Sequence, residues 1–441
     1  MTTVAEKARS AYGKLPENWT SRRLRFDVRL NPKKSALDMK ADELVSFIPM
    51  DAVGEHGGLR LDENRELADV YEGYTYFEDG DLCIAKITPC FENGKGALAE
   101  GLTNGVGFGT TELHVVRPGP GIDRRFLFYI SIADDFRKIG ESEMYGAGGQ
   151  KRIDEGFIKD WMPPLPPLET QRRIAQFLDE KTACIDGLIE KKRALLERLA
   201  EKRQALITRA VTKGLNPDAP MKPSGIDWLG DIPAHWDALP LRRILEIPLS
   251  NGIFKRKADF GEGALLINVF DVYRPDLKIN YPGLDRVRCD ENEIEKYEVA
   301  EGDILFVRSS LKMQGIAVAA IAQNIPEDIV FECHLVRARC RHDRILPRFI
   351  SFVLASAPYR ARLMSLAKTT TMTTLEQESL NSLYLTVPPL NEQTVVAEFL
   401  EKEMARIDNF GNHIEASIHR LHEYRSALIT AAVTGQIEGL Q

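Results

Sequence analysis

Leu165-Pro166-Pro167-Leu168-Glu169-Thr170-Gln171 begins a segment that ends on Ala205-Leu206-Ile207-Thr208-Arg209-Ala210-Val211-Thr212 and occurs a second time in the chain. The second copy starts 222 positions later, at Val387-Pro388-Pro389-Leu390, and ends at Ala432-Val433-Thr434. No gap is needed to align the copies, and 22 of the 48 positions are identical. A repeat of this length indicates an internal duplication, so the fold consists of two related halves.

The repeated segment has the pattern of a long helix that packs on another helix. Proline pairs stand before each copy, where they suit a first helical turn, and apolar residues then recur at heptad spacing. The predicted seam of the first copy is Ile185, Leu188, Lys192, Leu195, Leu199, Lys202 and Leu206. The equivalent seam of the second copy is Ile407, Phe410, Ile414, Ser417, Leu421, Tyr424 and Leu428. Residues 166–213 carry a net charge of +4 and residues 388–435 a net charge of −3, which favours pairing of the two copies. We expect an antiparallel coiled coil that holds one globular domain at each end.

Shorter motifs repeat outside the helices. Pro16-Glu17-Asn18-Trp19 matches Pro233-Ala234-His235-Trp236, and Gly80-Asp81 matches Gly302-Asp303. Between such anchors, alternating apolar runs such as 113–116 and 334–337 predict strands, whereas 122–139 and 346–367 have helical periodicity. The sequence therefore predicts an α+β (mixed α/β) fold with internal pseudo-two-fold symmetry. Its predicted parts are a polar lead-in (1–14), a first domain (15–164), a first long helix (165–214), a second domain (215–386) and a second long helix (387–441).

The composition of the 441 residues is that of an ordinary globular protein, with 44% hydrophobic and 28% charged residues. No apolar run approaches the roughly 20 residues of a membrane span, and the N-terminus lacks the apolar core of a signal peptide. We therefore expect a cytoplasmic protein with no membrane partner. The six cysteines form no C-x-x-C pair, and Cys333-His334 with Cys340 and His342, the nearest approach to a ligand cluster, lie in a strand pattern. No metal site is predicted.

Catalytic motifs are missing from the sequence. There is no G-x-x-x-x-G-K-[ST] phosphate loop, no H-E-x-x-H and no G-x-S-x-G. The net charge of −7 is also unlike the basic footprint of many nucleic-acid-binding domains. Affinity for DNA depends on local phosphate contacts, however, and seven basic residues gather between Ser21 and Lys40. We expect a protein that is not an enzyme by itself.

The repeated Pro-Pro-Leu-x-x-Gln…Ile-Asp…Ala-Leu-Ile-Thr-x-Ala-Val-Thr tail, together with the Pro-x-x-Trp entry to each half, resembles the specificity subunits of type I restriction–modification systems. The resemblance runs from Leu15 to Thr434. It implies two target-recognition domains that each read one half of a split site in double-stranded DNA, with the helix pair setting the gap between the half-sites. It also implies two modification (methyltransferase) subunits and restriction (motor-nuclease) subunits as partners. S-adenosylmethionine, ATP and Mg are then expected on those partners, with no cofactor on this chain.

The resemblance places a DNA-facing loop before the last strand of each domain. In the first domain that loop contains Gln150, Lys151 and Arg152, and in the second it contains Lys368, Thr370 and Thr371. Amide, basic and hydroxyl side chains of these types contact bases or phosphates. A second predicted set follows each Gly-Asp motif and consists of Lys86, Asn93 and Lys95, and of Arg308, Ser309 and Lys312. The basic run from Arg22 to Lys40 and the group Asn268, Tyr273 and Arg274 are further candidates.

Two other hypotheses of function are compatible with the sequence. One is a coiled-coil scaffold with two adaptor domains and no specific DNA binding, which predicts no salt-dependent affinity for DNA. The other is a self-contained nuclease or methyltransferase, which the missing cofactor and metal motifs argue against.

Overall fold

The computed structural model describes residues 3–12, 15–147, 149–369 and 372–441. They form two compact units, residues 1–193 with 415–441 and residues 194–414. Each unit thus contains one globular domain, the first part of one long helix and the last part of the other. Within the described ranges, no helix has the apolar length that crossing a bilayer requires.

The domain of the first unit is built around two four-stranded sheets. One has the order β2-β9-β6-β7 and the other β4-β3-β8-β5, in which β3 and β8 are parallel. The strands are β2 (Val28–Leu30), β3 (Leu44–Ile48), β4 (Asn64–Glu66), β5 (Thr75–Glu78), β6 (Leu82–Ala85), β7 (Gly96–Leu98), β8 (Val106–Gly109) and β9 (Leu113–Pro118). The helices are α1 (Val4–Tyr12), α2 (Leu67–Val70), α3 (Arg124–Ile132), α4 (Asp134–Glu143) and α5 (Glu155–Asp160). A short pair, β1 (Thr20–Ser21) and β10 (Pro164–Leu165), joins the ends of the domain just before α6 (Leu168–Lys213).

The domain of the second unit repeats this plan. Its sheets have the orders β14-β21-β17-β19 and β16-β15-β20, and again the two strands β15 and β20 are parallel. The strands are β14 (Ser250–Asn251), β15 (Phe260–Ile267), β16 (Asp285–Val287), β17 (Ile304–Val307), β19 (Ala319–Ile321), β20 (Ile329–Phe331) and β21 (Leu335–Ala338). The helices are α7 (Val269–Val272), α8 (Glu291–Tyr297), α9 (Pro347–Ala355), α10 (Ala357–Leu366) and α11 (Gln377–Asn381). The pair β13 (Asp237–Pro240) and β24 (Tyr384–Val387) joins the ends of the domain just before α12 (Leu390–Val433). A hairpin of β11 (Met221–Pro223) and β12 (Asp231–Pro233) comes before β13 in the chain.

These elements confirm the predicted mixed fold with two similar domains and two long helices. The predicted strands at 113–116 and 334–337 are β9 and β21. The predicted helical segments are each divided in two, because Ala133 and Ser356 have extended backbone angles between α3 and α4 and between α9 and α10.

The repeated Gly-Asp motif has a structural role in both domains. Asp81 and Asp303 are almost fully buried, and each accepts two hydrogen bonds from one arginine, Arg117 at 2.7 and 2.7 Å and Arg339 at 2.8 and 2.9 Å. The pKa of both arginines is raised, first because of this hydrogen bonding. A buried carboxylate without such a partner would be strongly destabilising. The motif therefore ties neighbouring strands together and does not itself face a ligand.

The ends of the long helices belong to the cores of the domains. Ile174 and Leu178 of α6 are buried in the first core with Ile429 of α12, and Val211 and Val396 are buried in the second core. Gly214, with a φ of 73°, follows the end of α6, where the left-handed conformation closes a helix. The helix pair is therefore anchored at both ends by apolar packing.

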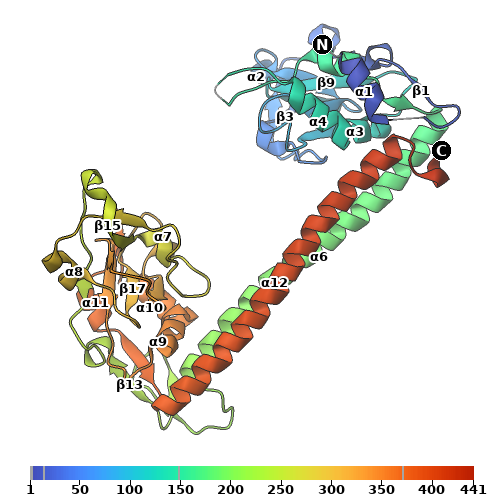
Figure 1. The fold of residues 1–441 in the computed structure, drawn as a ribbon. Coiled ribbons are helices and arrows are strands. Elements are labelled where there is room, and N and C mark those ends of the chain that lie inside the picture. The colour runs from blue at the N-terminus through green and yellow to red at the C-terminus, as the bar shows by residue number, and fades with distance from the viewer. Residues whose placement is uncertain (1–2, 13–14, 148, 370–371) are drawn as a thin grey trace. The chain divides into compact units, whose positions relative to one another are not determined.

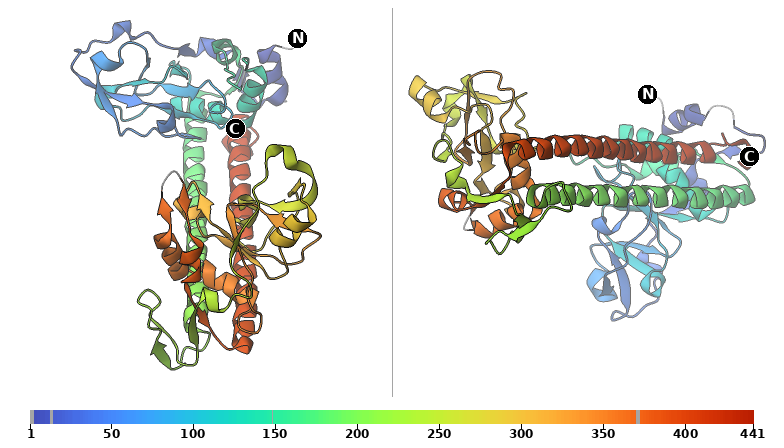
Figure 2. Two further views of the ribbon diagram at one scale, coloured as in Figure 1. Left: turned by 90° about the vertical axis from the view of Figure 1, so that its left-hand side faces the viewer. Right: turned by 90° about the horizontal axis from the view of Figure 1, so that it is seen from below.

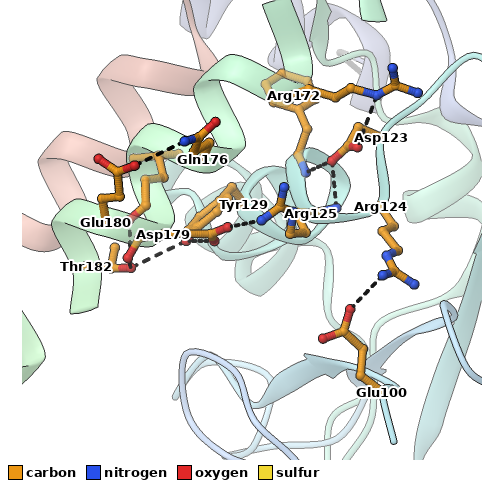
Figure 3. A network of polar contacts seen from close by, with 12 residues as sticks. Glu100, Asp123, Arg124, Arg125, Tyr129, Arg172, Gln176, Asp179, Glu180 and Thr182 are labelled. Carbon is orange, nitrogen blue, oxygen red and sulfur yellow. Dashed lines mark hydrogen bonds and ion pairs between the residues drawn. The ribbon is translucent and has the colours of Figure 1, made fainter. Parts of the chain in front are cut away.

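Polar contacts fix the angle at which α6 meets the first domain (Figure 3). Asp179 of α6 accepts a hydrogen bond from the Tyr129 hydroxyl at 2.7 Å and from Arg125 of α3 at 2.5 Å. Gln171 accepts from the backbone N–H of Asp123 at 2.8 Å. Contacts of this kind explain why polar residues of the helical repeat, such as Gln171, occur in both copies.

The second unit repeats the same docking contacts. Arg348 of α9 contacts Glu401 of α12 at 3.1 Å. Gln393, the equivalent of Gln171, accepts from the backbone N–H of Leu346 at 2.7 Å and donates to the Arg344 carbonyl at 3.0 Å. The repeat therefore conserves how each domain is held on its helices.

In each unit the two long helices lie side by side and run in opposite directions (Figures 1 and 2). Asp186, early in α6, pairs with Arg425, late in α12, and Arg203, late in α6, pairs with Asp408, early in α12. The predicted antiparallel coiled coil is confirmed.

The predicted register of the seam is only half right. Ile185 is buried, and Lys192, Leu199 and Leu206 are at least half-buried, as are Ile407, Ile414, Leu421 and Leu428. By contrast, Leu188, Leu195, Phe410 and Tyr424 are 43%, 37%, 48% and 57% exposed, and Lys202 is exposed. The residue that follows each of these five takes the inner position: Ile189, Leu196 and Arg203 in α6, and Gly411 and Arg425 in α12. Ser417, the remaining predicted seam residue, is half-buried as expected.

The error has a physical cause. Leu188-Ile189 and Leu195-Leu196 are adjacent apolar pairs, so hydrophobic periodicity alone does not choose between them. The correct register also places two arginines and a glycine at the seam, which a search for apolar residues rejects.

Candidate nucleic-acid interface

The structure brings together the two predicted segments of the first domain. Arg152 forms backbone bridges with both Ile87 and Tyr145, so the loop before the last strand pairs with the segment that follows the Gly-Asp motif. The backbone N–H of Thr88 donates to the Lys151 carbonyl at 3.0 Å. Lys86 and Lys151 therefore lie on neighbouring chain segments, although 65 positions separate them in the sequence.

The second domain has the same arrangement in a more regular form. The strand β18 (Ser309–Ser310) pairs with β23 (Thr373–Thr374), which pairs in turn with β22 (Lys368–Thr369). The two described ends of the predicted loop thus pair with each other as antiparallel strands. Thr370 and Thr371, two of its predicted contacts, lie outside the described residues.

Basic and amide side chains of the first-domain loop differ in their surroundings. Gln150 and Lys151 are exposed, and neither has a side-chain partner within the described part of the chain. Arg152 is bonded to Glu112 through two nitrogens, at 2.8 and 3.0 Å. This hydrogen bonding lowers the pKa of Glu112. Lys151 is consequently the cation of this loop that is available to a phosphate, whereas Arg152 is held by Glu112.

The second predicted set of the first domain is divided between two places. Asn93 donates to Glu55 at 3.3 Å, and the Lys95 ammonium donates to the Met50 carbonyl at 3.0 Å. Lys86 instead lines an open cavity of about 590 Å³ on the first domain with Lys33, Lys34 and several tyrosines. Lys34 stands 4.3 Å from the centre of the Tyr71 ring. Lysines beside aromatic rings suit a phosphate backbone and the faces of bases.

Part of the basic run from Arg22 to Lys40 is occupied within the protein. Arg22 donates to Asp27 at 2.8 Å, and Arg25 pairs with Asp160. Lys33 and Lys34 border the first-domain cavity, where Lys34 is itself engaged by the Tyr71 carbonyl and lies 3.6 Å from Glu72. The basic run therefore contributes at its centre, and its first arginines hold the fold.

A larger cavity, of about 890 Å³, lies on the second domain. It gathers the predicted residues Ser309, Lys312, Asn268 and Tyr273. Arg308 and Arg274 do not line it; the backbone of Arg308 bonds to His334 and Leu375. Lys368 is exposed and donates to Glu376 at 2.9 Å, which raises the pKa of the lysine.

Sequence reasoning missed the apolar and acidic lining of this second cavity. Phe270 and Leu311 border it and are 83% and 84% exposed, which is unusual for side chains of this size. Asp271 and Asp285 line it as well, and burial raises the pKa of Asp271. The available signal was Phe270 between Asn268 and Tyr273, a short polar and aromatic group that directly follows the apolar run Ala264–Ile267.

The side chains that line the two cavities are of types that can contact the edges of bases. An amide recognises adenine, a carboxylate accepts from the cytosine amino group, and apolar side chains contact the thymine methyl. The cavity of the first domain presents mainly lysines and tyrosines, and that of the second adds two aspartates, Phe270 and Leu311 to Asn268, Tyr273 and Lys312. Two domains of one fold thus offer different chemistry.

One cluster in the described residues has metal-ligating atoms. Glu332, Cys333 and His334 place three such atoms within 4.8 Å of one another. They are consecutive residues at the edge of the second cavity, and Cys340 is buried elsewhere in the core. Three ligands from one tripeptide fall short of the four that a structural zinc site uses.

Comparison with known families gives a consistent result. The model of the type I restriction modification DNA specificity domain matches the chain twice, over residues 32–198 and 252–420. The specificity subunit of the type I restriction enzyme EcoAI from Escherichia coli is 45% identical over 163 residues, 36% of this chain. That alignment spans 27% of the length of the relative.

Solved structures show the same fold at low sequence identity. The HsdS subunit from Thermoanaerobacter tengcongensis aligns over 96% of this chain and 98% of its own, with a TM-score of 0.54 and 16% identity. A chain from a structural study of complex assembly and conformational transition of the type I R-M system aligns over 96% of this chain and 100% of its own, with a TM-score of 0.74 and 16% identity.

Proposed function

The chain belongs to the type I restriction–modification DNA specificity family, and on that premise we propose that it is the DNA-recognition subunit of a type I complex. Each domain reads one half of a bipartite site in double-stranded DNA, and the helix pair sets the gap. The chain carries no catalytic residues of its own. It recruits two modification subunits and restriction subunits, which bring S-adenosylmethionine, ATP and Mg, and it acts in the cytoplasm.

One observation carries this proposal: the duplication keeps the docking of each domain on the helices, whereas the open cavities of the two domains are lined by different elements. Gln171 and Gln393 make the same contacts in the two units. The cavity linings share no such pattern, since the first has Lys33, Lys34 and Lys86 and the second has Asn268 and Phe270. A duplicated scaffold with diverged surfaces suits two readers of unlike sequences.

We assign the contacts by chemistry. Lys86, Lys151 and Lys312 are suited to phosphates, which position the protein but carry little sequence information. Asn93, Gln150, Ser309 and the paired strands β22 and β23 with Lys368 are suited to base edges. The side chains of Lys95 and Arg152 are engaged by the protein itself, through Met50 and Glu112, and support these segments. Arg308 joins them through its backbone, which bonds to His334 and Leu375.

The helices supply the length of the gap. The 46 residues of α6 extend over about 69 Å at 1.5 Å per residue. Because α6 and α12 each run through both units, a change in their length should change the distance between the two target-recognition domains.

The proposal is tested with the chain, its methyltransferase partner and a duplex library in which two randomised blocks flank a variable gap. Methylation is expected only on duplexes that share one split motif with one gap. Methylation without a shared split motif would refute the proposal. A scaffold without DNA specificity would also lack the steep loss of affinity with salt that several phosphate contacts cause.

A further inference from the structure

Two arginines at equivalent positions of the repeat lie at the seam between the long helices. Arg203 of α6 pairs with Asp408 of α12, and Arg425 of α12 has its Nε 3.3 Å from Asp186 of α6. Both aspartates belong to the repeated Ile-Asp motif. Each pair lies within one unit, so the same interhelical contact is made twice.

Each arginine also donates to a backbone carbonyl of a domain; Arg203 makes a hydrogen bond to Asp408 as well, whereas Arg425 contacts Asp186 as an ion pair without a hydrogen bond. The Nη2 of Arg203 donates to the Pro275 carbonyl at 2.6 Å, and the Nη2 of Arg425 donates to the His56 carbonyl at 3.4 Å. A guanidinium has donors on separate nitrogens in a rigid plane, so it can hold two acceptors in fixed directions at once. Each arginine therefore joins three elements: its own helix, the partner helix and a domain loop.

In the first domain, the loop that Arg425 holds supports a predicted DNA contact. The backbone N–H of His56 donates to the Gly94 carbonyl at 3.3 Å, and Glu55 accepts from Asn93 at 3.3 Å. The buried Arg137 of α4 also holds this loop, donating to the Phe91 carbonyl at 2.9 Å. The loop that contains Asn93 is thus held by two arginines.

In the second domain, Arg203 holds a segment that leads into the larger cavity. Pro275 lies two residues after Tyr273, which lines that cavity and donates from its hydroxyl to the Gly315 carbonyl at 3.3 Å. Lys312 and Gln314 line the same cavity. The contact again connects the helix pair to a face proposed to read DNA.

We propose that Arg203 and Arg425 are positioning residues that lock the reading segments of each domain to the helix pair, so that the complex accepts one gap between half-sites. The inference rests on the proposed function. Changing the gap by one base pair moves a half-site by about 3.4 Å and turns it by roughly 35°. A domain that is free to tilt on its helix follows such a change more easily than a locked one.

The experiment compares Arg425→Gln and Arg203→Gln with matched controls, Arg420→Gln and Arg198→Gln. The control positions are also equivalent arginines of the repeat; both are exposed, and within the described residues neither has a side-chain partner. Methylation rates and binding constants are measured, with the methyltransferase partner present, on duplexes with the native gap and with one base pair fewer or more.

We expect the preference for the native gap to fall by about tenfold in Arg425→Gln and in Arg203→Gln, the effect of losing one charge-assisted hydrogen bond. Base preferences within each half-site should not change, and the control variants should keep the wild-type preference. Arg425→Lys should resemble Arg425→Gln, because a single ammonium does not hold two divergent acceptors in a plane.

A purely structural role predicts equal weakening on all gaps, and that result would overturn the inference. If Arg425→Gln does not fold, Asp186→Asn removes the interhelical pair from a half-exposed aspartate and should loosen the gap preference in the same direction. If the wild-type complex recognises no split site, the proposed function fails as well. If the wild type is selective and every variant remains equally selective, only the positioning role fails.

Discussion

Lengthening the helix pair by one heptad should lengthen the gap in the recognised site. The perturbation duplicates residues 192–198 in α6 and 409–415 in α12, near the middle of both helices. Seven residues keep the heptad register of the seam and add about 10.5 Å at 1.5 Å per residue. DNA rises about 3.4 Å per base pair, so the gap should grow by up to about 3 base pairs.

The assay is single-molecule sequencing of DNA methylated by the complex, with wild-type and lengthened chains compared on the same genome. The lengthened chain should methylate a motif with the same two half-sites and a larger gap. The same duplication in α6 alone is the control, since an unmatched heptad disrupts the pairing and should abolish methylation. An unchanged gap, or altered bases in either half-site, would refute the reasoning that the helices set the spacing.

Three further results are expected. Ile189→Ala should lower the free energy of unfolding by roughly 2–4 kcal/mol and Leu188→Ala by less than about 1 kcal/mol in thermal melts, because Ile189 is 3% and Leu188 43% exposed; equal losses would contradict the observed seam. Burial lowers the pKa of His114 from its ordinary 6.5, so the unfolded chain binds the extra proton first, and the free energy of unfolding should fall as the pH drops below about 6.5. The melting temperature of His114→Gln should therefore fall less than that of the wild type between pH 7.5 and 5.5. An equal fall in both proteins would contradict this expectation. Lys151→Ala should weaken binding to all sequences alike and reduce the slope of log affinity against log salt by about 1, whereas altered base preference would show that Lys151 reads a base.

The sequence predicted the architecture because duplication leaves a direct record. The two copies of the tail, the Pro-x-x-Trp entries and the Gly-Asp motifs are all visible as identities. The role of the Gly-Asp motif was not visible. Its partners Arg117 and Arg339 lie 36 positions further along the chain, and only the sheet brings them next to the buried aspartates.

Prediction of the candidate site was partial for a similar reason. The segments at Lys86 and Lys151 could be named separately, but their pairing depends on a backbone bridge across the domain. Whether a cation is available depends on neighbours that are distant in sequence. Glu112, for example, accepts hydrogen bonds from Arg152. The sequence around Arg152 gives no sign of this partner, because it lies 40 positions earlier in the chain. Exposure of Phe270 and Leu311 is also a property of the folded surface.

The central claim is that each domain independently reads one half of a split site. Its most direct test replaces residues 19–162 with the equivalent domain of another family member and maps the methylated motif of the chimaera together with the methyltransferase partner. We expect one half-site to change while the other half-site and the gap stay the same. A motif in which both half-sites change, or neither does, would contradict it.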